Sequence, residues 1–154
     1  VAEAFARYGS VPLEKALAQD RFEEILALEI EPRLGSPKPT LLIDYPLAFG
    51  SLARRKAGEP AAAERFEIYI GGLELANGFT ELTDAGEQRG RFERENELRM
   101  RRGRQPYPMP EAFLQDLSRM PEAAGIAVGV DRVVMLFADA SAIDEVVAFT
   151  PEEL

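Results

Sequence analysis

The chain has 154 residues, 46% of them apolar, and a formal net charge of −9. A chain of this size and composition can bury the core of one domain, and no run approaches the roughly 20 consecutive apolar residues of a membrane span. Cysteine and histidine are both absent, which excludes disulfides, thiolate metal sites and a Ser-His-Asp triad. The negative charge argues against a general nucleic-acid surface. We expect a cytoplasmic protein.

The first half of the chain predicts helices followed by strands. Apolar residues recur with helical spacing over 2–8, 13–18 and 20–30, and Pro32 should stop the last of these helices. Residues 40–43 form a short apolar run, which is typical of a buried strand. The clearest signal is a hairpin: residues 65–70 alternate, Gly71-Gly72 makes a two-residue turn, and 73–82 returns.

The second half continues with helices around a further strand. Asp84 and Glu87 form a capping box at the start of a long polar helix that should reach about residue 102. We expect another helix over 111–120, a glycine-bearing strand over 124–130, a last helix from Asp131 and a closing strand over 146–149. This mixed order with a central hairpin predicts an α+β fold, mainly an antiparallel sheet flanked by helices.

Two carboxylates of the hairpin, Glu67 and Glu74, fall on one face if Gly71-Gly72 is a two-residue turn. They would repel each other and would be costly to bury unless a cation lay between them. Mg²⁺ carrying a nucleotide's phosphates suits such a pair, because it prefers a few carboxylates and keeps some waters. The alternative, which the pattern alone favours, is a solvated sheet face with both carboxylates pointing outward.

A carboxylate, an amide and an aromatic ring follow on the returning strand as Glu81, Asn77 and Phe79. Together they would suit an amino group, with charge from Glu81, a hydrogen bond from Asn77 and a wall from Phe79. Strict alternation places them opposite Glu74, although a bulge at Gly78 could restore a common face. The alternative is an ordinary strand end with an Asn-Gly turn.

The segment 125–132 places two glycines in an apolar strand just before a helix. Gly125 and Gly129 would let a flat ligand approach the backbone closely. Arg132, in the first turn of the helix, could point its guanidinium at a phosphate. The alternative is an arginine that pairs with a nearby carboxylate.

Taken together, segments 65–84, 88–92 and 124–132 resemble the C-terminal half of lysyl-tRNA synthetase catalytic domains, and 125–132 is similar to class II motif 3. Within that group the chain looks most like the elongation factor P–lysine ligases, which are paralogues without an anticodon-binding domain. The resemblance implies a class II aminoacyl-tRNA synthetase-like core, present only as its C-terminal half. It would occupy residues 39–151 after a helical lead-in of 1–38, in a single partial domain of 1–154.

The resemblance implies roles at the nucleotide. Glu67 and Glu74 match acidic residues around ATP-bound Mg²⁺ ions, and Glu74, Leu75 and Gly129 lie beside the ATP. Arg132 matches the motif 3 arginine at the γ-phosphate and would be the catalytic residue.

Other positions match the family's lysine pocket. Asn77, Phe79 and Glu81 would bind the substrate, with Glu81 the partner of its side-chain amine. Ala127 stands where true synthetases usually carry glycine. In the ligases this alanine reshapes the pocket and goes with (R)-β-lysine over α-lysine.

The implied activity of the intact enzyme is ATP-dependent activation of (R)-β-lysine or lysine as an adenylate. The acyl group then passes to a lysine of elongation factor P. No segment resembles motif 1, which forms the homodimer, or motif 2; both would precede Val1, so we expect a fragment that is inactive alone. Two alternatives are a lysyl-tRNA synthetase fragment, which Ala127 and the acidity disfavour, and a non-catalytic module.

Overall fold

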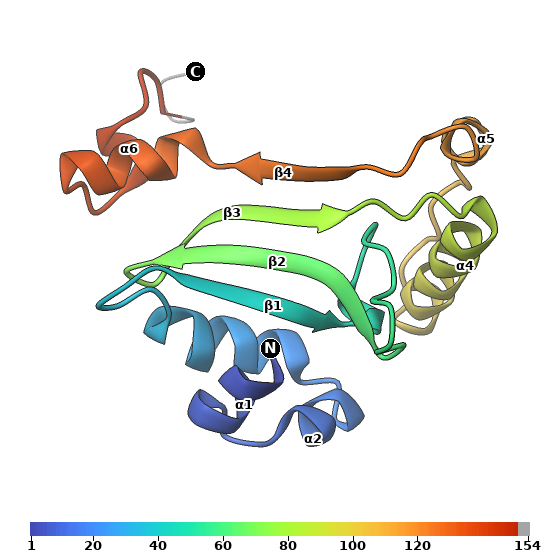
Figure 1. Ribbon diagram of the computed structural model, residues 1–154, viewed down its shortest axis with the longest axis horizontal. Helices are drawn as coiled ribbons and strands as arrows, with labels where there is room; N and C mark the ends of the chain where they lie inside the picture. Colours follow the sequence, from blue (N-terminus) through green and yellow to red (C-terminus); the bar gives the residue numbers. More distant parts are fainter. Residues whose placement is uncertain (151–154) are drawn as a thin grey trace. The chain divides into compact units, whose positions relative to one another are not determined.

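A computed structural model describes residues 1–150 and contains a four-stranded sheet of order β1-β2-β3-β4. Its strands are β1 (Thr40–Pro46), β2 (Ala62–Ile70), β3 (Leu73–Thr80) and β4 (Ala124–Val128). Neighbouring strands run in opposite directions (Figure 1). The predicted α+β class, the antiparallel sheet and the adjacency of the two hairpin strands are confirmed.

The chain divides into two compact units. Within the described residues, unit 1 comprises 1–44, 66–78 and 126–150, and unit 2 comprises 45–65 and 79–125. Each of the four strands passes from one unit into the other, because a boundary falls inside every strand. The division into 1–38 and 39–151 that the sequence suggests remains a prediction. Residues 151–154, at the end of the chain, lie outside the described residues.

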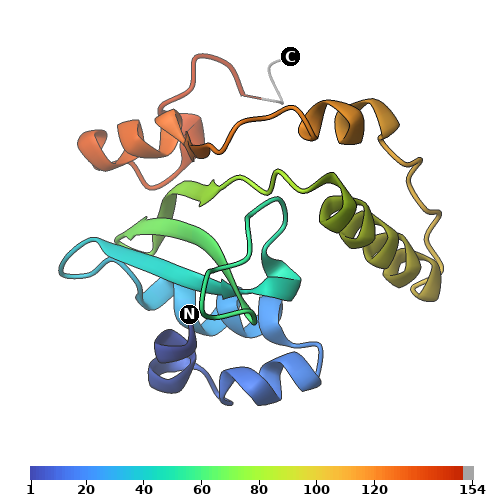
Figure 2. The ribbon, with the colours of Figure 1, turned by 45° about the vertical axis from the view of Figure 1, so that its right-hand side comes forward.

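Unit 1 begins with a helical layer on one side of β1 (Figures 1 and 2). The Phe5 and Phe22 rings stack in its core with centroids 5.2 Å apart. The expected helix over 20–30 is present from Phe22, and it changes from α-helical to π-helical at Leu26. Pro32 lies near the start of a 3₁₀ turn, where its missing N–H needs no partner. The elements are α1 (Ala2–Tyr8), α2 (Leu13–Ala18), α3 (Phe22–Ile25), η1 (Leu26–Ile30) and η2 (Glu31–Arg33).

The turn of the hairpin is anchored to the segment after η2. Gly71 and Gly72 have φ of 60° and 78°, which is the two-residue turn that the sequence predicts. Their N–H groups donate to the carbonyls of Gly35 and Leu34 at 2.9 and 2.7 Å. A Cβ at position 35 would lie 2.5 Å from the Cα of Ile70, so only glycine allows this approach.

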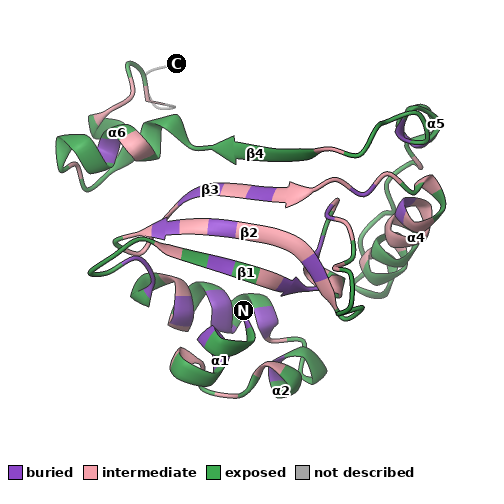
Figure 3. Cartoon of the chain, in the orientation of Figure 1, coloured by how far each residue is buried: buried purple, intermediate pink, exposed green. Residues whose placement is uncertain are grey.

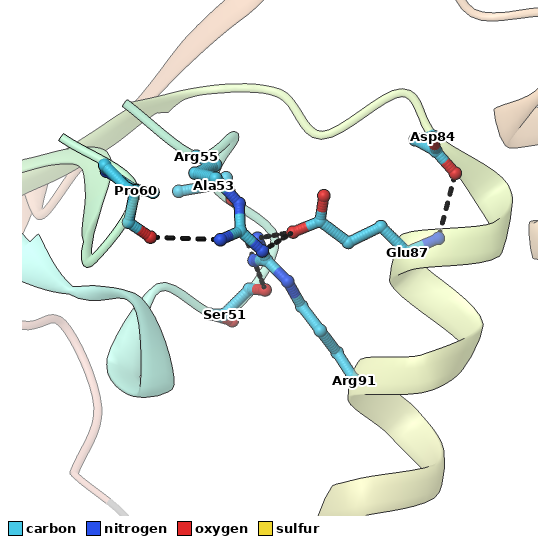
Figure 4. Close-up of polar contacts among 7 residues, drawn as sticks. All are labelled: Ser51, Ala53, Arg55, Pro60, Asp84, Glu87 and Arg91. Atoms are coloured by element: carbon cyan, nitrogen blue, oxygen red, sulfur yellow. Dashed lines mark hydrogen bonds and ion pairs between the residues drawn. The ribbon is translucent and has the colours of Figure 1, made fainter. Parts of the chain in front are cut away.

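Unit 2 contains the 3₁₀ turn η3 (Leu47–Phe49) and the helices α4 (Ala85–Arg101) and α5 (Glu111–Leu117), which an extended segment joins (Figure 2). The Asp84 side chain accepts from the N–H of Glu87 at 2.9 Å, as expected for the cap of α4. Glu87 in turn binds Arg91 at 2.7 Å (Figure 4). Arg91 also donates to the carbonyls of Ser51 and Ala53, both at 2.8 Å. These bonds hold the loop before β2 against α4.

Two expectations about the strands are wrong. Residues 146–149 form turns and bends, because the N–H groups of Val146 and Val147 donate back to Ile143 in η4 (Ile143–Glu145). The strand at 40–43 exists but is not buried on both faces, since Leu41 and Ile43 are exposed on either side of buried Leu42.

Exposure is also high over β4 and most of α6 (Val130–Ala138), which are green in Figure 3. Helix α6 begins at Val130, one residue before Asp131, where the sequence predicts its start. Among residues 1–150 no helix is long and apolar enough to cross a bilayer.

Candidate active site

The carboxylate of Glu67 is the centre of a hydrogen-bonded group in unit 1. Glu67 lies on β2 with only 5% of its surface exposed, so the alternative of a solvated carboxylate is wrong for this residue. The Tyr69 hydroxyl donates to its Oε2 at 2.6 Å, and Asn77 Nδ2 donates to its Oε1 at 3.1 Å. Both oxygens are thereby oriented.

Asn77 reaches this carboxylate because β3 departs from strict alternation. The alternation of buried and exposed residues breaks at Leu75 and Ala76, which are both buried. The sequence predicts this break at Gly78, but it comes earlier in the strand. A carboxylate can only accept, which fixes the amide of Asn77 with Nδ2 toward Glu67. Asn77 Oδ1 is then buried without a partner among the described residues. It is an acceptor in position for a donor such as an amine.

Glu74 and Arg132 form the more exposed part of the group. Arg132 Nη1 donates to the backbone carbonyl of Glu74 at 2.8 Å and lies 3.4 Å from its Oε2. The pairing with a carboxylate that the sequence left open is therefore present. The side chains are 45% and 35% exposed. Within residues 1–150, Nε and Nη2 of Arg132 make no hydrogen bond, which leaves two directions for an anion.

Gly129 positions Arg132 at the start of α6. Its N–H donates to the carbonyl of Leu75 at 2.8 Å, which joins the end of β4 to β3. A Cβ at position 129 would lie 3.3 Å from Cδ of Arg132. Glycine at this position therefore leaves room for the arginine to turn back toward Glu74.

Glu31 is a third carboxylate of this group, and the sequence did not indicate it. Burial raises its pKa above the usual range, and the nearby charges of Glu67 and Glu74 raise it further. A hydrogen bond with Tyr69 and the charge of Arg132 act in the opposite direction but are outweighed. Glu31 is therefore close enough to Glu67, Glu74 and Arg132 for their charges to act on it.

The residues fit a magnesium ion that arrives with a nucleotide. No group of three or more metal-ligating side chains exists in the part of the chain that is described. A nucleotide-bound Mg²⁺ needs fewer, because phosphate oxygens and waters complete its octahedron. Glu67 and Glu74 are the two carboxylates suited to hold it, and both act on the pKa of Glu31 beside them.

Two of the predicted substrate residues, Phe79 and Glu81, belong to unit 2, whereas Asn77 and the exposed Ala127 belong to unit 1. The N–H of Glu81 donates to the carbonyl of Ala123 at 2.9 Å. A Cβ at position 125 would lie 3.1 Å from Glu81 Oε1, so Gly125 makes room for this carboxylate. That these four predicted residues line one pocket remains a prediction.

Known proteins are similar in sequence to this chain over most of its length. Residues 7–153 match the family described as tRNA synthetases class II (D, K and N). Several relatives carry the name elongation factor P–(R)-β-lysine ligase. The protein of Salmonella gallinarum is 44% identical over 127 residues, 82% of this chain and 39% of its own length. That of Klebsiella pneumoniae is 46% identical over the same shares of the two chains. That of Proteus mirabilis is 47% identical over 78% of this chain and 37% of its own length.

The chain thus spans about two fifths of the length of these relatives. The family match covers β1 to β4 and α6, and with them every residue of the group around Glu67. The chain belongs to the class II tRNA synthetases of the D, K and N group.

Proposed function

We propose that the full gene product is a ligase that activates (R)-β-lysine, or lysine, with ATP and transfers it to a lysine side chain of elongation factor P. The names of the relatives support this choice of substrates. The observation that carries it in the structure is the hydrogen bond from Asn77 to Glu67, which places a partnerless amide oxygen beside a buried carboxylate. The amide oxygen of Asn77 can then accept from an amine, and the carboxylate of Glu67 beside it can bind a metal ion that carries a nucleotide.

In the first step the substrate carboxylate attacks the α-phosphorus of ATP, an acyl-phosphate bond forms, and pyrophosphate leaves. Arg132 binds a terminal phosphate with its unbonded N–H groups and so stabilises the departing charge. Its contact with the Glu74 carbonyl holds the guanidinium in place. A magnesium ion held by Glu67 and Glu74 would neutralise phosphate charge. Because the chemistry needs positioning and charge rather than a general base, it does not require histidine.

The amino groups of the substrate are recognised by acceptors. Asn77 Oδ1 accepts one N–H, and Glu81 binds the side-chain ammonium. Phe79 supplies an apolar wall, and Ala127 selects between the two positions of the amino group. In the second step the ε-amine of the acceptor lysine attacks the acyl carbon and AMP leaves. We place the reaction in the cytoplasm, with the gene product acting as a homodimer and tRNA not serving as acceptor.

The test is ATP–pyrophosphate exchange by the full gene product with (R)-β-lysine, with α-lysine and without amino acid. Exchange should depend on the amino acid and should be faster with (R)-β-lysine. Transfer is then measured by mass spectrometry on purified elongation factor P and, in parallel, on tRNA. Lysylated tRNA with unmodified factor would make the protein a lysyl-tRNA synthetase, and no exchange under any condition would favour a non-catalytic module.

A further inference from the structure

Tyr69 and Glu31 have no part in the roles given above, yet their side chains meet beside the proposed metal carboxylate. Tyr69 is 1% exposed, and its hydroxyl donates to Glu67 Oε2 at 2.6 Å. The same hydroxyl lies beside Glu31, whose pKa its hydrogen bond lowers. A phenol has a single proton, so Tyr69 donates fully to one carboxylate at a time, and its short bond is the one to Glu67. Glu31 and Glu67 are therefore the two carboxylates that the Tyr69 hydroxyl faces.

The backbone fixes the positions of Tyr69 and Glu31. Tyr69 lies on β2, two residues from Glu67 and two from Gly71 in the hairpin turn. Glu31 begins η2, whose following residues Leu34 and Gly35 accept hydrogen bonds from that turn. The two elements that carry Tyr69 and Glu31 are thus tied to each other independently of the side chains. A hydroxyl held in this way can act on the orientation of the carboxylate that it contacts.

Glu67 has little freedom to rotate once both of its oxygens are held, one by Tyr69 and the other by Asn77. Metal ligands are commonly fixed by such outer hydrogen bonds, and loss of the outer partner lowers metal affinity. We propose that Tyr69 is a positioning residue that holds Glu67 in the orientation that binds the magnesium of the nucleotide. This inference rests on the proposed function, because it presupposes a magnesium–ATP site at Glu67.

The experiment measures ATP binding to the full gene product by calorimetry across a series of Mg²⁺ concentrations, without amino acid and so without turnover. Tyr69→Phe should raise the Mg²⁺ concentration for half-maximal ATP binding about tenfold. Binding at saturating Mg²⁺ should be retained, because we assign Tyr69 no contact with the nucleotide. The control is Tyr45→Phe, which removes a hydroxyl from an equally buried tyrosine in unit 2 whose ring lies 4.4 Å from the Arg65 guanidinium. Its Mg²⁺ requirement should stay at the wild-type value.

A second variant keeps the test decisive if Tyr69→Phe does not fold. Asn77→Ala removes the other hydrogen bond that orients Glu67 and should raise the Mg²⁺ requirement in the same direction, by about threefold or more. If Asn77→Ala and any folded Tyr69→Phe protein titrate within about twofold of wild type, these hydrogen bonds do not position Glu67 and the inference is wrong. If wild-type protein binds no ATP at any Mg²⁺ concentration, the proposed function itself fails.

Discussion

Two carboxylates, Glu67 in unit 1 and Glu87 in unit 2, are held by different kinds of donor. Glu87 accepts from the guanidinium of Arg91 at 2.7 Å and lies 3.7 Å from that of Arg55 (Figure 4). Glu67 accepts from the hydroxyl of Tyr69 and the amide of Asn77. A guanidinium cancels the charge of a carboxylate, whereas neutral donors orient it and leave the charge.

The two carboxylates also act differently on the groups around them. In unit 1, Glu67 and Glu74 add to the effect of burial and raise the pKa of Glu31, even though Arg132 opposes them. In unit 2, the ion pair of Glu87 and Arg91 joins a helix to a loop through the carbonyls of Ser51 and Ala53. The ion pair in unit 2 stabilises the fold, whereas the hydrogen bonds in unit 1 orient a carboxylate of the proposed ligand site. Substitutions in the two regions should therefore affect different properties.

Arg132→Ala should give the largest effect on activity with little effect on stability. We expect adenylate formation by the full gene product to fall by roughly a hundredfold or more, about 3 kcal/mol, because a charge-assisted phosphate contact is lost. The midpoint of thermal unfolding should change little, since the side chain is half-exposed. The matched control is Arg119→Ala in unit 2, an exposed arginine 3.7 Å from Asp116. Adenylate formation at the wild-type rate in the Arg132 variant would make this arginine structural.

Ala127→Gly addresses substrate choice within unit 1. Removing the methyl should open space for an α-amino group, and so raise kcat/KM for α-lysine relative to (R)-β-lysine by about ten- to a hundredfold. The measurement is kcat/KM for both lysines in both proteins. A ratio that stays constant, or that moves toward (R)-β-lysine, would mean that Ala127 does not contact the substrate.

Arg91→Ala should reduce stability without changing the nucleotide site. The side chain is 11% exposed and joins α4 to the loop before β2. Its loss should cost about 2 kcal/mol of local stability, because several charge-assisted hydrogen bonds disappear together. Hydrogen exchange of the amides in residues 50–57 should accelerate accordingly. Arg101→Ala, on the same helix but 75% exposed, should leave exchange unchanged. Equal hydrogen exchange of these amides in both variants would mean that Arg91 does not stabilise the loop before β2.

Much of the fold could be predicted from local signals. The hairpin was predictable because Gly71-Gly72 permits positive φ at both turn positions, and α4 because Asp84 caps it. The closing strand at 146–149 was wrong because apolar β-branched residues indicate burial in any conformation, and here a 3₁₀ turn directs the chain back on itself.

The site was predictable only where the ligands lie on the hairpin itself. Glu67 and Glu74 could be placed together because the turn fixes their register. Tyr69 was missed although its spacing of two residues puts it on the face of Glu67, since a tyrosine in a strand is usually core. Glu31 had no local signal. It comes to the site through the close approach of Gly35 to Ile70, which is a long-range contact.

The most direct test of the magnesium–nucleotide site in unit 1 is the Mg²⁺ dependence of ATP affinity in two isosteric variants of the full gene product. Glu74→Gln removes a carboxylate of the proposed metal site that is 35% exposed and lies 3.4 Å from Arg132, and Glu87→Gln removes one that lies 2.7 Å from Arg91. We predict that Glu74→Gln raises the Mg²⁺ concentration for half-maximal ATP binding at least about tenfold, whereas Glu87→Gln leaves it at the wild-type value. An unchanged requirement in Glu74→Gln, or an equal shift in both variants, would contradict a magnesium–nucleotide site in unit 1.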